Sequence, residues 1–473
     1  MTHEQRVVIL GAGPAGVSAA ETLVAAGVRP VVLDENARWG GQVYRQPPAN
    51  ATFERSKQTL YGFEARKADA LHTTMAALLP HLDYRPDTLA WSCGRGRLDT
   101  LHAGRETGVP FTHLIIASGA TDRVLPVPGW TLPGVYTLGG AQVALKSQGC
   151  AIGRRVVLAG TGPLLYLVAY QYMKAGAQIV AVLDTSAFSQ QVAAAPRLAH
   201  QPATLAKGLY YVGWLQAHGV RIERHVTLVG IGGEHHVNAI TWHGATKETL
   251  ACDAVGLGFG LRPETQLADL AGCRFRFDAQ NRCWLPELDA AGRSSVPGIY
   301  LAGDGAGIAG ADAAELAGRR IALAVLDDLG IAHPRGPNLP GVASLERRLQ
   351  RIAVFRQGLE SAFALPAGYA SQWPNEMTVC RCEEVDAGTL RGCIRSGGAT
   401  EINRLKALTR VGMGRCQGRM CGEAALALLS AETGRPLEAV GRLRSQPPVK
   451  PIPLSPGLYA DDVAEIPEEA RDE

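Results

Sequence analysis

Four cysteines near the carboxyl end of the chain are spaced so that they could hold a metal centre. Cys380 and Cys382 lie in TVCRCEEV, and Cys416 and Cys421 lie in GMGRCQGRMCGE. Alternate residues of an extended segment project to the same side, so the first pair can bind one centre. The second pair lies in a glycine-rich loop whose backbone amides can turn toward sulfur. The spacing favours a [2Fe–2S] cluster over the alternative, a structural zinc ion that would make this region a docking module.

The other cysteines are predicted to be structural. Cys393 lies between the two cluster pairs, matches no ligand position and is expected in the core. The remaining five stand alone, and an isolated cysteine is usually a small buried apolar residue. A flavin-linked disulfide reductase needs a close cysteine pair, and the sequence has none before Cys380. Thiol–disulfide chemistry is therefore disfavoured for the isolated set, which is Cys93, Cys150, Cys252, Cys273 and Cys283.

A glycine-rich segment near the amino end predicts a dinucleotide site. VVILGAGPAG, residues 7–16, is followed by an apolar helix and then by the strand VVLDE. Gly11 permits a tight turn, Gly13 lets the backbone approach a pyrophosphate, and Gly16 lets the helix pack closely on the strand. The amino end of that helix can bind the phosphates. Asp34, or its neighbour Glu35, is expected to accept hydrogen bonds from a ribose.

Three further segments fit the same site. GGQVYR (residues 40–45) follows the acidic residues at a distance suited to a second phosphate loop, and LIIASGA (114–120) is a buried strand that ends in small residues. GIYLAGDGAG (298–307) places Asp304 after a strand, where it can bind a ribityl hydroxyl. The residues predicted to contact the dinucleotide are Gly11, Gly13, Pro14, Ala15, Gly16, Asp34, Glu35, Gly41, Gln42, Arg45, Ala117, Ser118, Gly119, Gly303 and Asp304.

The glycine pattern occurs a second time, in a weaker form. VVLAGTGPLL (156–165) contains Gly160 and Gly162, but Leu165 takes the place of the third glycine. The following strand ends at Asp184, whose charge disfavours a 2′-phosphate, so a dinucleotide bound here would be NAD rather than NADP. Two alternatives remain open at this point, namely a scaffold that binds nothing and a site for another nucleotide such as ATP.

Strands, glycine turns and helices alternate along the chain, which indicates an α/β fold. The 473 residues suggest about three domains. A net charge of +3 without a basic cluster excludes nucleic acid as a partner. The uncharged run 156–173 contains Gly160, Gly162 and Pro163 at strand–turn–helix spacing, so no transmembrane segment is predicted. No secretion signal is visible before the first strand, and the expected location is the cytoplasm.

The four dinucleotide segments, in this order, resemble the flavoproteins with two dinucleotide-binding domains, the glutathione-reductase-like group. That resemblance implies FAD, an FAD-binding domain formed by residues 1–145 and 284–330, and an inserted second nucleotide-binding domain at 146–283. The cysteine spacing, with GRCQGRMCG around the second pair, resembles the bacterioferritin-associated-ferredoxin-like [2Fe–2S] domain, expected at 372–440. Residues 331–371 would then be a linker and residues 441–473 a carboxyl-terminal tail.

With GGQVYRQPP and PPVKPIPL included, nearly the whole chain resembles the α (or A) subunits of heteromeric FAD-dependent amine and amino-acid dehydrogenases. This group includes opine oxidase, D-hydroxyproline dehydrogenase, hydrogen cyanide synthase and dye-linked L-proline dehydrogenase. The resemblance implies an electron-transfer subunit that serves oxidation of a secondary amine or amino acid of the opine or D-hydroxyproline type.

The same resemblance implies which partners the chain would have. The substrate would be oxidised on a β subunit similar to D-amino-acid oxidase. The resemblance also allows an FMN at a subunit interface and a small ferredoxin-like γ subunit. A downstream electron acceptor could bring the complex to a membrane surface. The sequence agrees in one respect, since it has no paired carboxylates or His/Asp arrangement that marks an amine site, and the catalytic residues stay unassigned. The competing hypothesis is a self-sufficient NADH-dependent ferredoxin-type reductase.

Overall fold

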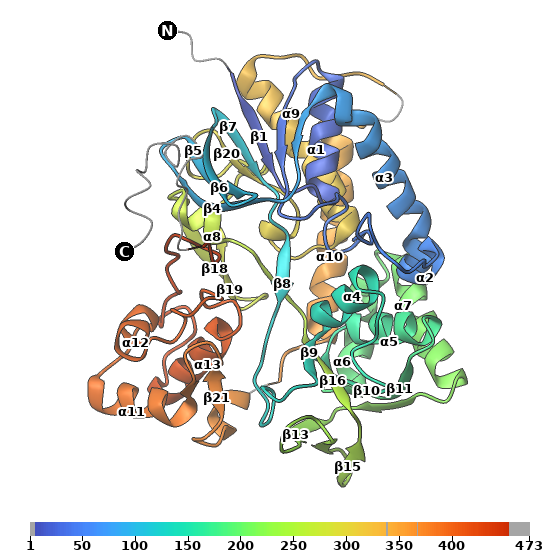
Figure 1. Ribbon diagram of the computed structural model, residues 1–473, viewed down its shortest axis with the longest axis vertical. Helices are drawn as coiled ribbons and strands as arrows, with labels where there is room; N and C mark the ends of the chain where they lie inside the picture. The colour runs from blue at the N-terminus through green and yellow to red at the C-terminus, as the bar shows by residue number, and fades with distance from the viewer. Residues whose placement is uncertain (1–4, 337–338, 367, 454–473) are drawn as a thin grey trace, which may run out of the picture.

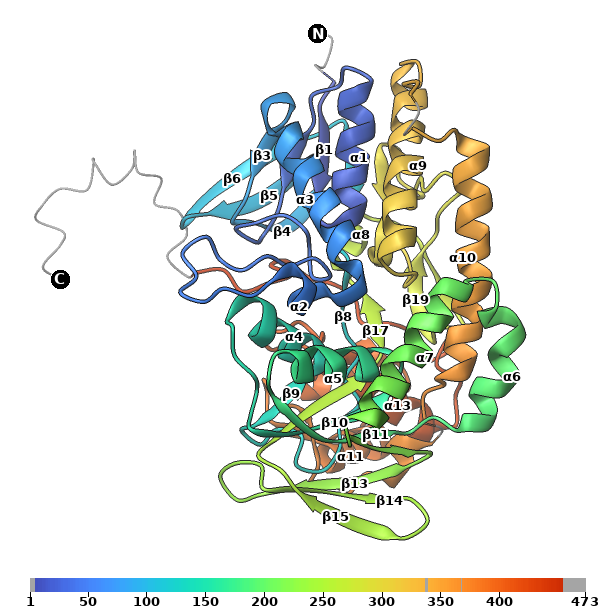
Figure 2. The ribbon, with the colours of Figure 1, turned by 90° about the vertical axis from the view of Figure 1, so that its right-hand side faces the viewer.

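A parallel five-stranded sheet is the centre of the first domain. The computed structural model describes residues 5–336, 339–366 and 368–453. Helices α1 (Pro14–Ala25) and α9 (Ala311–Leu329) pack against each other beside this sheet (Figures 1 and 2). Apart from His113 at the start of one strand, the strands in the middle of the sheet are apolar and buried, as expected for a parallel sheet that is covered on both faces. Their order is β20 (Ile299–Leu301), β7 (His113–Ile116), β1 (Val7–Leu10), β2 (Val31–Leu33) and β3 (Asp83–Arg85).

A second parallel sheet forms the inserted domain. Helices α5 (Leu164–Lys174) and α7 (Pro202–Ala217) pack together on it. Strand β9 (Val135–Thr137) pairs with β16 (Ala254–Phe259) in this sheet, so β9 lies in the inserted domain although we expected it in the FAD-binding domain. A strand of three residues carries too little sequence signal to be assigned to either sheet. The remaining strands, which complete the order β12-β11-β10-β16-β9, are β10 (Arg155–Thr161), β11 (Gln178–Asp184) and β12 (Arg221–Arg224).

The segment expected to be a linker contains a long helix. Helix α10 (Val342–Ala362) packs on α9 and on α6 (Phe188–Leu198), and so connects the two domains from outside (Figure 2). Its apolar residues recur at intervals of three and four, which is the period of a helix that covers a core. The pattern is a weak signal in the sequence, because charged residues separate the apolar positions. The apolar positions are Leu345, Leu349, Ile352, Phe355, Leu359 and Ala362.

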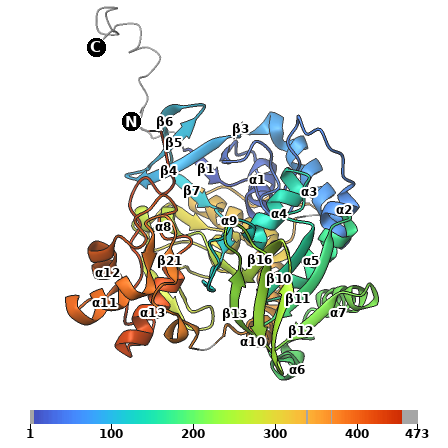
Figure 3. The same ribbon diagram turned by 60° about the horizontal axis from the view of Figure 1, so that its bottom comes forward.

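A small carboxyl-terminal domain with its own core carries the four predicted ligand cysteines. Figure 3 shows its helices on one side of the molecule, with α6 and α7 on the other. Among the described residues, no helix is long and apolar enough to cross a membrane. The domain consists of β21 (Thr378–Cys380), β22 (Val385–Asp386), α11 (Ala387–Gly397), α12 (Ile402–Thr409) and α13 (Gly422–Thr433).

Candidate functional site

The first glycine turn is as tight as its sequence predicts. Gly11 has φ = +103°, and a Cβ added there would lie 2.4 Å from the Ala117 carbonyl oxygen. A Cβ added at Gly16 would lie 1.8 Å from the Gly11 carbonyl oxygen. Both values are far below contact distance, so the backbone requires glycine at these two positions. Gly13 instead precedes α1 directly, where the free backbone N–H groups of the helix can bind a phosphate.

The two acidic residues after β2 have different surroundings. Asp34 is buried, and its carboxylate accepts hydrogen bonds from the backbone N–H of Ala12 (2.6 Å) and of Asn36 (2.7 Å). Burial raises the pKa of Asp34, while these backbone donors oppose that rise. Its oxygens therefore already stabilise the glycine turn. Glu35 is exposed and forms an ion pair with Lys450, so Glu35 has the carboxylate that is more accessible to a ribose.

The remaining dinucleotide segments converge on the same place. Gly40 N–H donates to the Ala12 carbonyl (2.8 Å), which holds the second phosphate loop against the first turn. Gly41 then faces Gly13, with its added Cβ only 3.0 Å from the Gly13 Cα. Asp304 Oδ1 accepts hydrogen bonds from the backbone N–H of Ala309 and Gly310, both at 2.8 Å, which orients the carboxylate.

One cavity of about 1170 Å³ connects these residues. Gly13 and Gly41 present bare backbone to it at the amino end of α1, and Glu35 and Asp304 supply acceptors on either side. This arrangement fits FAD. Gly16 lies outside the lining, beneath the turn, where it has a packing role. The predicted residues that line the cavity are Gly11, Gly13, Pro14, Ala15, Asp34, Glu35, Gly41, Gln42, Arg45, Ala117, Ser118, Gly119, Gly303 and Asp304.

Lys146 is a cavity residue that the sequence analysis missed. It is the only basic residue of α4 (Leu138–Ser147), and its Nζ donates to the Val43 carbonyl (3.0 Å) of the second phosphate loop. Its side chain is almost fully buried, and burial lowers the pKa of Lys146 to about 8. A lone lysine near a helix end carries no sequence signal, because basic residues are common in the last helical turn.

The acidic residue and the first glycine of the second glycine motif are engaged in contacts within the inserted domain. Asp184 is fully buried, and its carboxylate accepts hydrogen bonds from the Tyr166 hydroxyl (2.6 Å) and the Ser186 hydroxyl (2.7 Å). A Cβ on Gly160 would lie 1.8 Å from a backbone oxygen of β16, so this glycine serves strand packing. Gly160, Gly162 and Asp184 all lie outside the cavity lining.

The four predicted ligand cysteines lie together. The Cys421 thiol donates to Cys380 and Cys416, and Cys382 donates to Cys416. The hydrogen bond from Cys421 and those from backbone amides lower the pKa of Cys380 to about 6, and similar bonds lower the pKa of Cys416 to about 5. A Cβ at Gly414 would lie 2.4 Å from the Cβ of Cys382, so the loop needs glycine to close around the sulfurs.

The donor set is that of an iron–sulfur cluster. Four cysteines with backbone N–H groups directed at their sulfurs are the ligands and the surroundings that a [2Fe–2S] cluster requires. Among the described residues, no group of three or more His, Cys, Asp or Glu side chains is arranged around a single-ion position. The backbone donors are Glu383 and Gly412 at Cys380, Cys416 at Cys382, and Gly418 and Met420 at Cys416.

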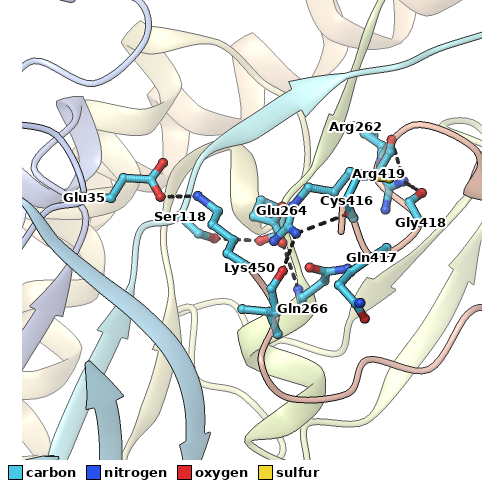
Figure 4. A network of polar contacts seen from close by, with 11 residues as sticks. Glu35, Ser118, Arg262, Glu264, Gln266, Cys416, Gln417, Gly418, Arg419 and Lys450 are labelled. Atoms are coloured by element: carbon cyan, nitrogen blue, oxygen red, sulfur yellow. Dashed lines mark hydrogen bonds and ion pairs between the residues drawn. The ribbon is translucent and has the colours of Figure 1, made fainter. Parts of the chain in front are cut away.

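The loop that carries Cys416 and Cys421, here called the cysteine loop, contacts the predicted dinucleotide residues that line the cavity, here called the FAD cradle. Cys416 and Arg419 line the same cavity as the glycine turn. Arg419 Nε lies 2.6 Å from Glu264 Oε2, and both side chains are mostly buried. The Ser118 hydroxyl donates to the Glu264 carbonyl (2.6 Å), so three residues connect the flavin segment 114–120 with the cysteine loop (Figure 4). Gln266 adds a hydrogen bond to the Gln417 carbonyl (2.7 Å).

Glu264→Gln is expected to loosen this junction. Burial raises the pKa of Glu264, but the charge and hydrogen bond of Arg419 outweigh burial, and the net pKa is lowered. The carboxylate therefore stabilises the protein at neutral pH, and this stabilisation is lost as the pH falls through the lowered pKa. The variant leaves Arg419 buried and unpaired, which should lower the free energy of unfolding by about 3 kcal/mol. Chemical unfolding at neutral and acidic pH measures both effects.

A matched control separates the loss of a buried ion pair from the loss of a carboxylate charge as such. Glu287→Gln breaks the exposed pair of Glu287 with Arg274, and such pairs contribute about 0 to 1 kcal/mol. Wild-type protein should lose more stability than Glu264→Gln on acidification, while the control should follow the wild type. Equal neutral-pH stability of Glu264→Gln and Glu287→Gln would show that the junction does not depend on the ion pair.

Comparisons with known proteins agree with both halves of the site. Residues 5–325 match the pyridine nucleotide-disulphide oxidoreductase family, and residues 378–431 match the BFD-like [2Fe-2S] binding domain. The A subunit of opine oxidase from Agrobacterium tumefaciens is 36% identical, with 98% of this chain and 92% of that protein covered. The HcnB subunit of hydrogen cyanide synthase from Pseudomonas aeruginosa is 33% identical, with 95% and 97% covered. L-proline dehydrogenase from P. horikoshii has a similar fold, with a TM-score of 0.71 and 18% identity over 95% of this chain and 78% of that chain.

Proposed function

The chain belongs to the pyridine nucleotide-disulphide oxidoreductase family, in the group that contains the A subunit of opine oxidase together with HcnB, and from this premise we propose its role. It is the electron-transfer α subunit of a heteromeric enzyme that oxidises a secondary amine or amino acid of the opine or D-hydroxyproline type. The family match to a flavin oxidoreductase and the match to a [2Fe-2S] domain supply the two redox centres, FAD and the cluster.

One observation carries this proposal: the FAD cradle and the cysteine loop open into a single cavity. When bound, FAD accepts electrons in pairs and can release them singly, whereas an iron–sulfur cluster carries one at a time. Cys416 lies at the cavity wall, and Glu264 with Arg419 holds its loop against the flavin segment. Such an arrangement suits conversion of two-electron chemistry into one-electron transfer.

Within the chain, each part of the cradle has a distinct task toward FAD. Gly13 and Gly41 would leave backbone N–H groups and space for the pyrophosphate, Glu35 would accept from the ribose, and Asp304 would accept from the ribityl chain. Asp34 and Gly16 act through the backbone by holding the turn in place. On the cluster side, the amides of Gly412 and Gly418 donate to cysteine sulfur, and such hydrogen bonds would tune the reduction potential of a bound cluster.

Substrate oxidation is assigned to a partner β subunit similar to D-amino-acid oxidase. In the described part of the chain, no histidine lines the cavity. Of the cavity carboxylates outside the cradle and its junctions, Asp122 accepts from the backbone N–H of Gly139 and Glu64 pairs with Lys207. An interfacial FMN and a small ferredoxin-like γ subunit belong to this proposed complex, which passes electrons to a downstream acceptor. We place the complex in the cytoplasm, with contact to the membrane through that acceptor.

The experiment that tests the function compares the isolated chain with the reconstituted complex. Under anaerobic conditions, a secondary amine should bleach the flavin and the cluster of this chain only when the β subunit is present. The purified chain should bind FAD and iron but leave the amine unchanged. Turnover of the amine by the isolated chain, at the rate of the complex, would place the chemistry in this chain and end the proposal.

NADH is expected to leave the flavin oxidised, although GTGPLL favours an NADH-dependent reductase as the second candidate. The hydroxyls of Tyr166 and Ser186 donate to the Asp184 carboxylate, so the carboxylate at the end of β11 is not free to bind a ribose. An anaerobic absorption spectrum before and after NADH addition measures this directly, with photoreduction as the positive control. Rapid bleaching of the flavin and cluster bands by NADH would favour the reductase instead.

A further inference from the structure

The cavity continues past the FAD cradle into the inserted domain. Its far part lies between α5, α6, α7 and α10, and we call it the apolar lobe. The cavity of about 1170 Å³ therefore extends beyond the residues predicted to contact FAD, and this part of it is open to a second ligand. The apolar lobe is defined by Leu164, Leu167, Leu198, Leu205, Leu359 and Phe363.

The apolar lobe opens to solvent through a hydrophobic mouth. Three residues line the cavity and are also more than half exposed, which places them at its opening. Phe188 is 62% exposed and Val192 56% exposed on α6, and Leu209 on α7 is 66% exposed. Grouped exposed apolar side chains of this kind mark a site that receives an apolar ligand or surface. The mouth lies on the side of the molecule away from α11 and α13 (Figures 1 and 3).

The inner end of the apolar lobe is polar and adjoins the FAD loop. Lys146 donates to the Val43 carbonyl, and Gln142 Nε2 donates to Gln171 Oε1 (2.9 Å). All four residues line the cavity. With its pKa near 8, Lys146 can exchange a proton at neutral pH. A ligand that fits has hydrogen-bonding oxygens at the flavin end and a long apolar chain that leads to the mouth.

We propose that the apolar lobe binds an isoprenoid quinone, with its ring at Lys146 and Gln142 and its tail between α6, α7 and α10. The quinone is then the electron acceptor of the proposed function, on which this inference rests. Its two carbonyl oxygens take up two electrons and two protons and become the two hydroxyls of the quinol. Reduced FAD loses the same two electrons and two protons. The hydrophobic mouth lets the tail enter from a membrane surface.

Two glycines of α7 provide a matched pair for the test. Gly208 lines the apolar lobe, and an added Cβ meets nothing within 4 Å, so Gly208→Phe fills the lobe without a backbone clash. Gly213 lies in the same helix, is equally open and lies outside the lining, so Gly213→Phe is the control. The FAD-loaded full chain is photoreduced anaerobically, which makes the result independent of any amine or partner subunit. Ubiquinone-2, the tailless ubiquinone-0 and oleate are then added separately.

The wild-type chain should be oxidised faster by ubiquinone-2 than by ubiquinone-0. Gly208→Phe should slow the reaction with ubiquinone-2 by about tenfold, the factor that ~1.4 kcal/mol of overpacking produces, and leave ubiquinone-0 nearly unaffected. Gly213→Phe should match the wild type with both quinones. Tail dependence in the wild type tests the proposal even if Gly208→Phe does not fold.

Several results would overturn the assignment. Equal rates with the tailed and tailless quinones would show that the lobe does not receive the tail. Binding of oleate without any advantage for ubiquinone-2 would assign the lobe to a lipid acyl chain. Loss of quinone reactivity in Gly213→Phe as well would point to the helix rather than the lobe. If the chain reduces ubiquinone-2 but the reconstituted complex with the β subunit does not oxidise the amine, this inference is kept and the proposed function is removed.

Discussion

Cys416→Ser is expected to abolish the [2Fe–2S] cluster while the flavin stays bound. Cys416 contacts two other ligand thiols, and serine replaces a soft thiolate by a hard oxygen that holds iron–sulfur clusters poorly. Iron should fall from about two atoms per chain to none, as a [2Fe–2S] centre implies. The FAD cradle lies on other elements and should remain intact. Metal and labile-sulfide analysis, with the visible spectrum, measures both cofactors in one sample.

Cys393→Ser is the matched control for this prediction. Cys393 lies in α11 and packs on the core of the same domain, outside the hydrogen bonds that join the four ligand thiols. Its variant should keep full iron and sulfide. A normal cluster in Cys416→Ser would show that the ligand set is wrong. Zinc in place of iron and sulfide in the wild type would instead make the domain a structural module and remove its electron-transfer role.

Gly16→Ala is expected to abolish FAD binding and to destabilise the first domain. The new methyl group would lie 1.8 Å from the Gly11 carbonyl oxygen, which belongs to the turn that faces the pyrophosphate. Either α1 or the turn must move, and overpacking of this kind costs about 3 kcal/mol. We therefore expect purified protein without FAD and a lower free energy of unfolding, measured by flavin content and by chemical unfolding.

Gly213→Ala separates this steric effect from helix propensity. Gly213 also lies within a helix, but an added Cβ there meets nothing within 4 Å. Alanine should stabilise α7 by about 0.5 to 1 kcal/mol, because glycine has the higher entropy cost of folding. FAD content should be unchanged. If Gly16→Ala bound FAD as the wild type does, the close approach of α1 to the turn would not be needed for the cofactor.

Contacts between residues far apart in the chain decide how the redox centres are coupled. Arg419 reaches Glu264 across 155 positions of sequence, and Lys450 reaches Glu35 across 415. Val449 N–H donates to the Trp91 carbonyl (3.0 Å), so the segment after the cysteine domain returns to the FAD-binding domain. The cluster domain is thus held to the cradle through its cysteine loop and through the segment that follows the domain.

The sequence by itself determined the local chemistry of this protein. Turn geometry depends on a few adjacent residues, so Gly11 and Gly16 could be recognised from type and spacing alone. The grouping of the four cysteines could be predicted in the same way, because Cys380 and Cys382 are close in the chain and the loop around Cys416 needs glycines that the sequence displays. The α/β fold followed from alternating strands and helices, and the family comparisons confirm that class.

Only the tertiary structure decided which of these residues act together. Asp34 and Glu35 are equivalent by type, yet burial and hydrogen bonds commit Asp34 to the backbone and leave Glu35 accessible. Asp184 ends its strand much as Asp34 follows β2, yet its carboxylate accepts hydrogen bonds from Tyr166 and Ser186. The shared cavity, the Glu264–Arg419 pair and the apolar lobe depend on the packing of helices that are distant in sequence. Spacing along a chain carries no information about such contacts, since their geometry is set by how the sheets and helices pack.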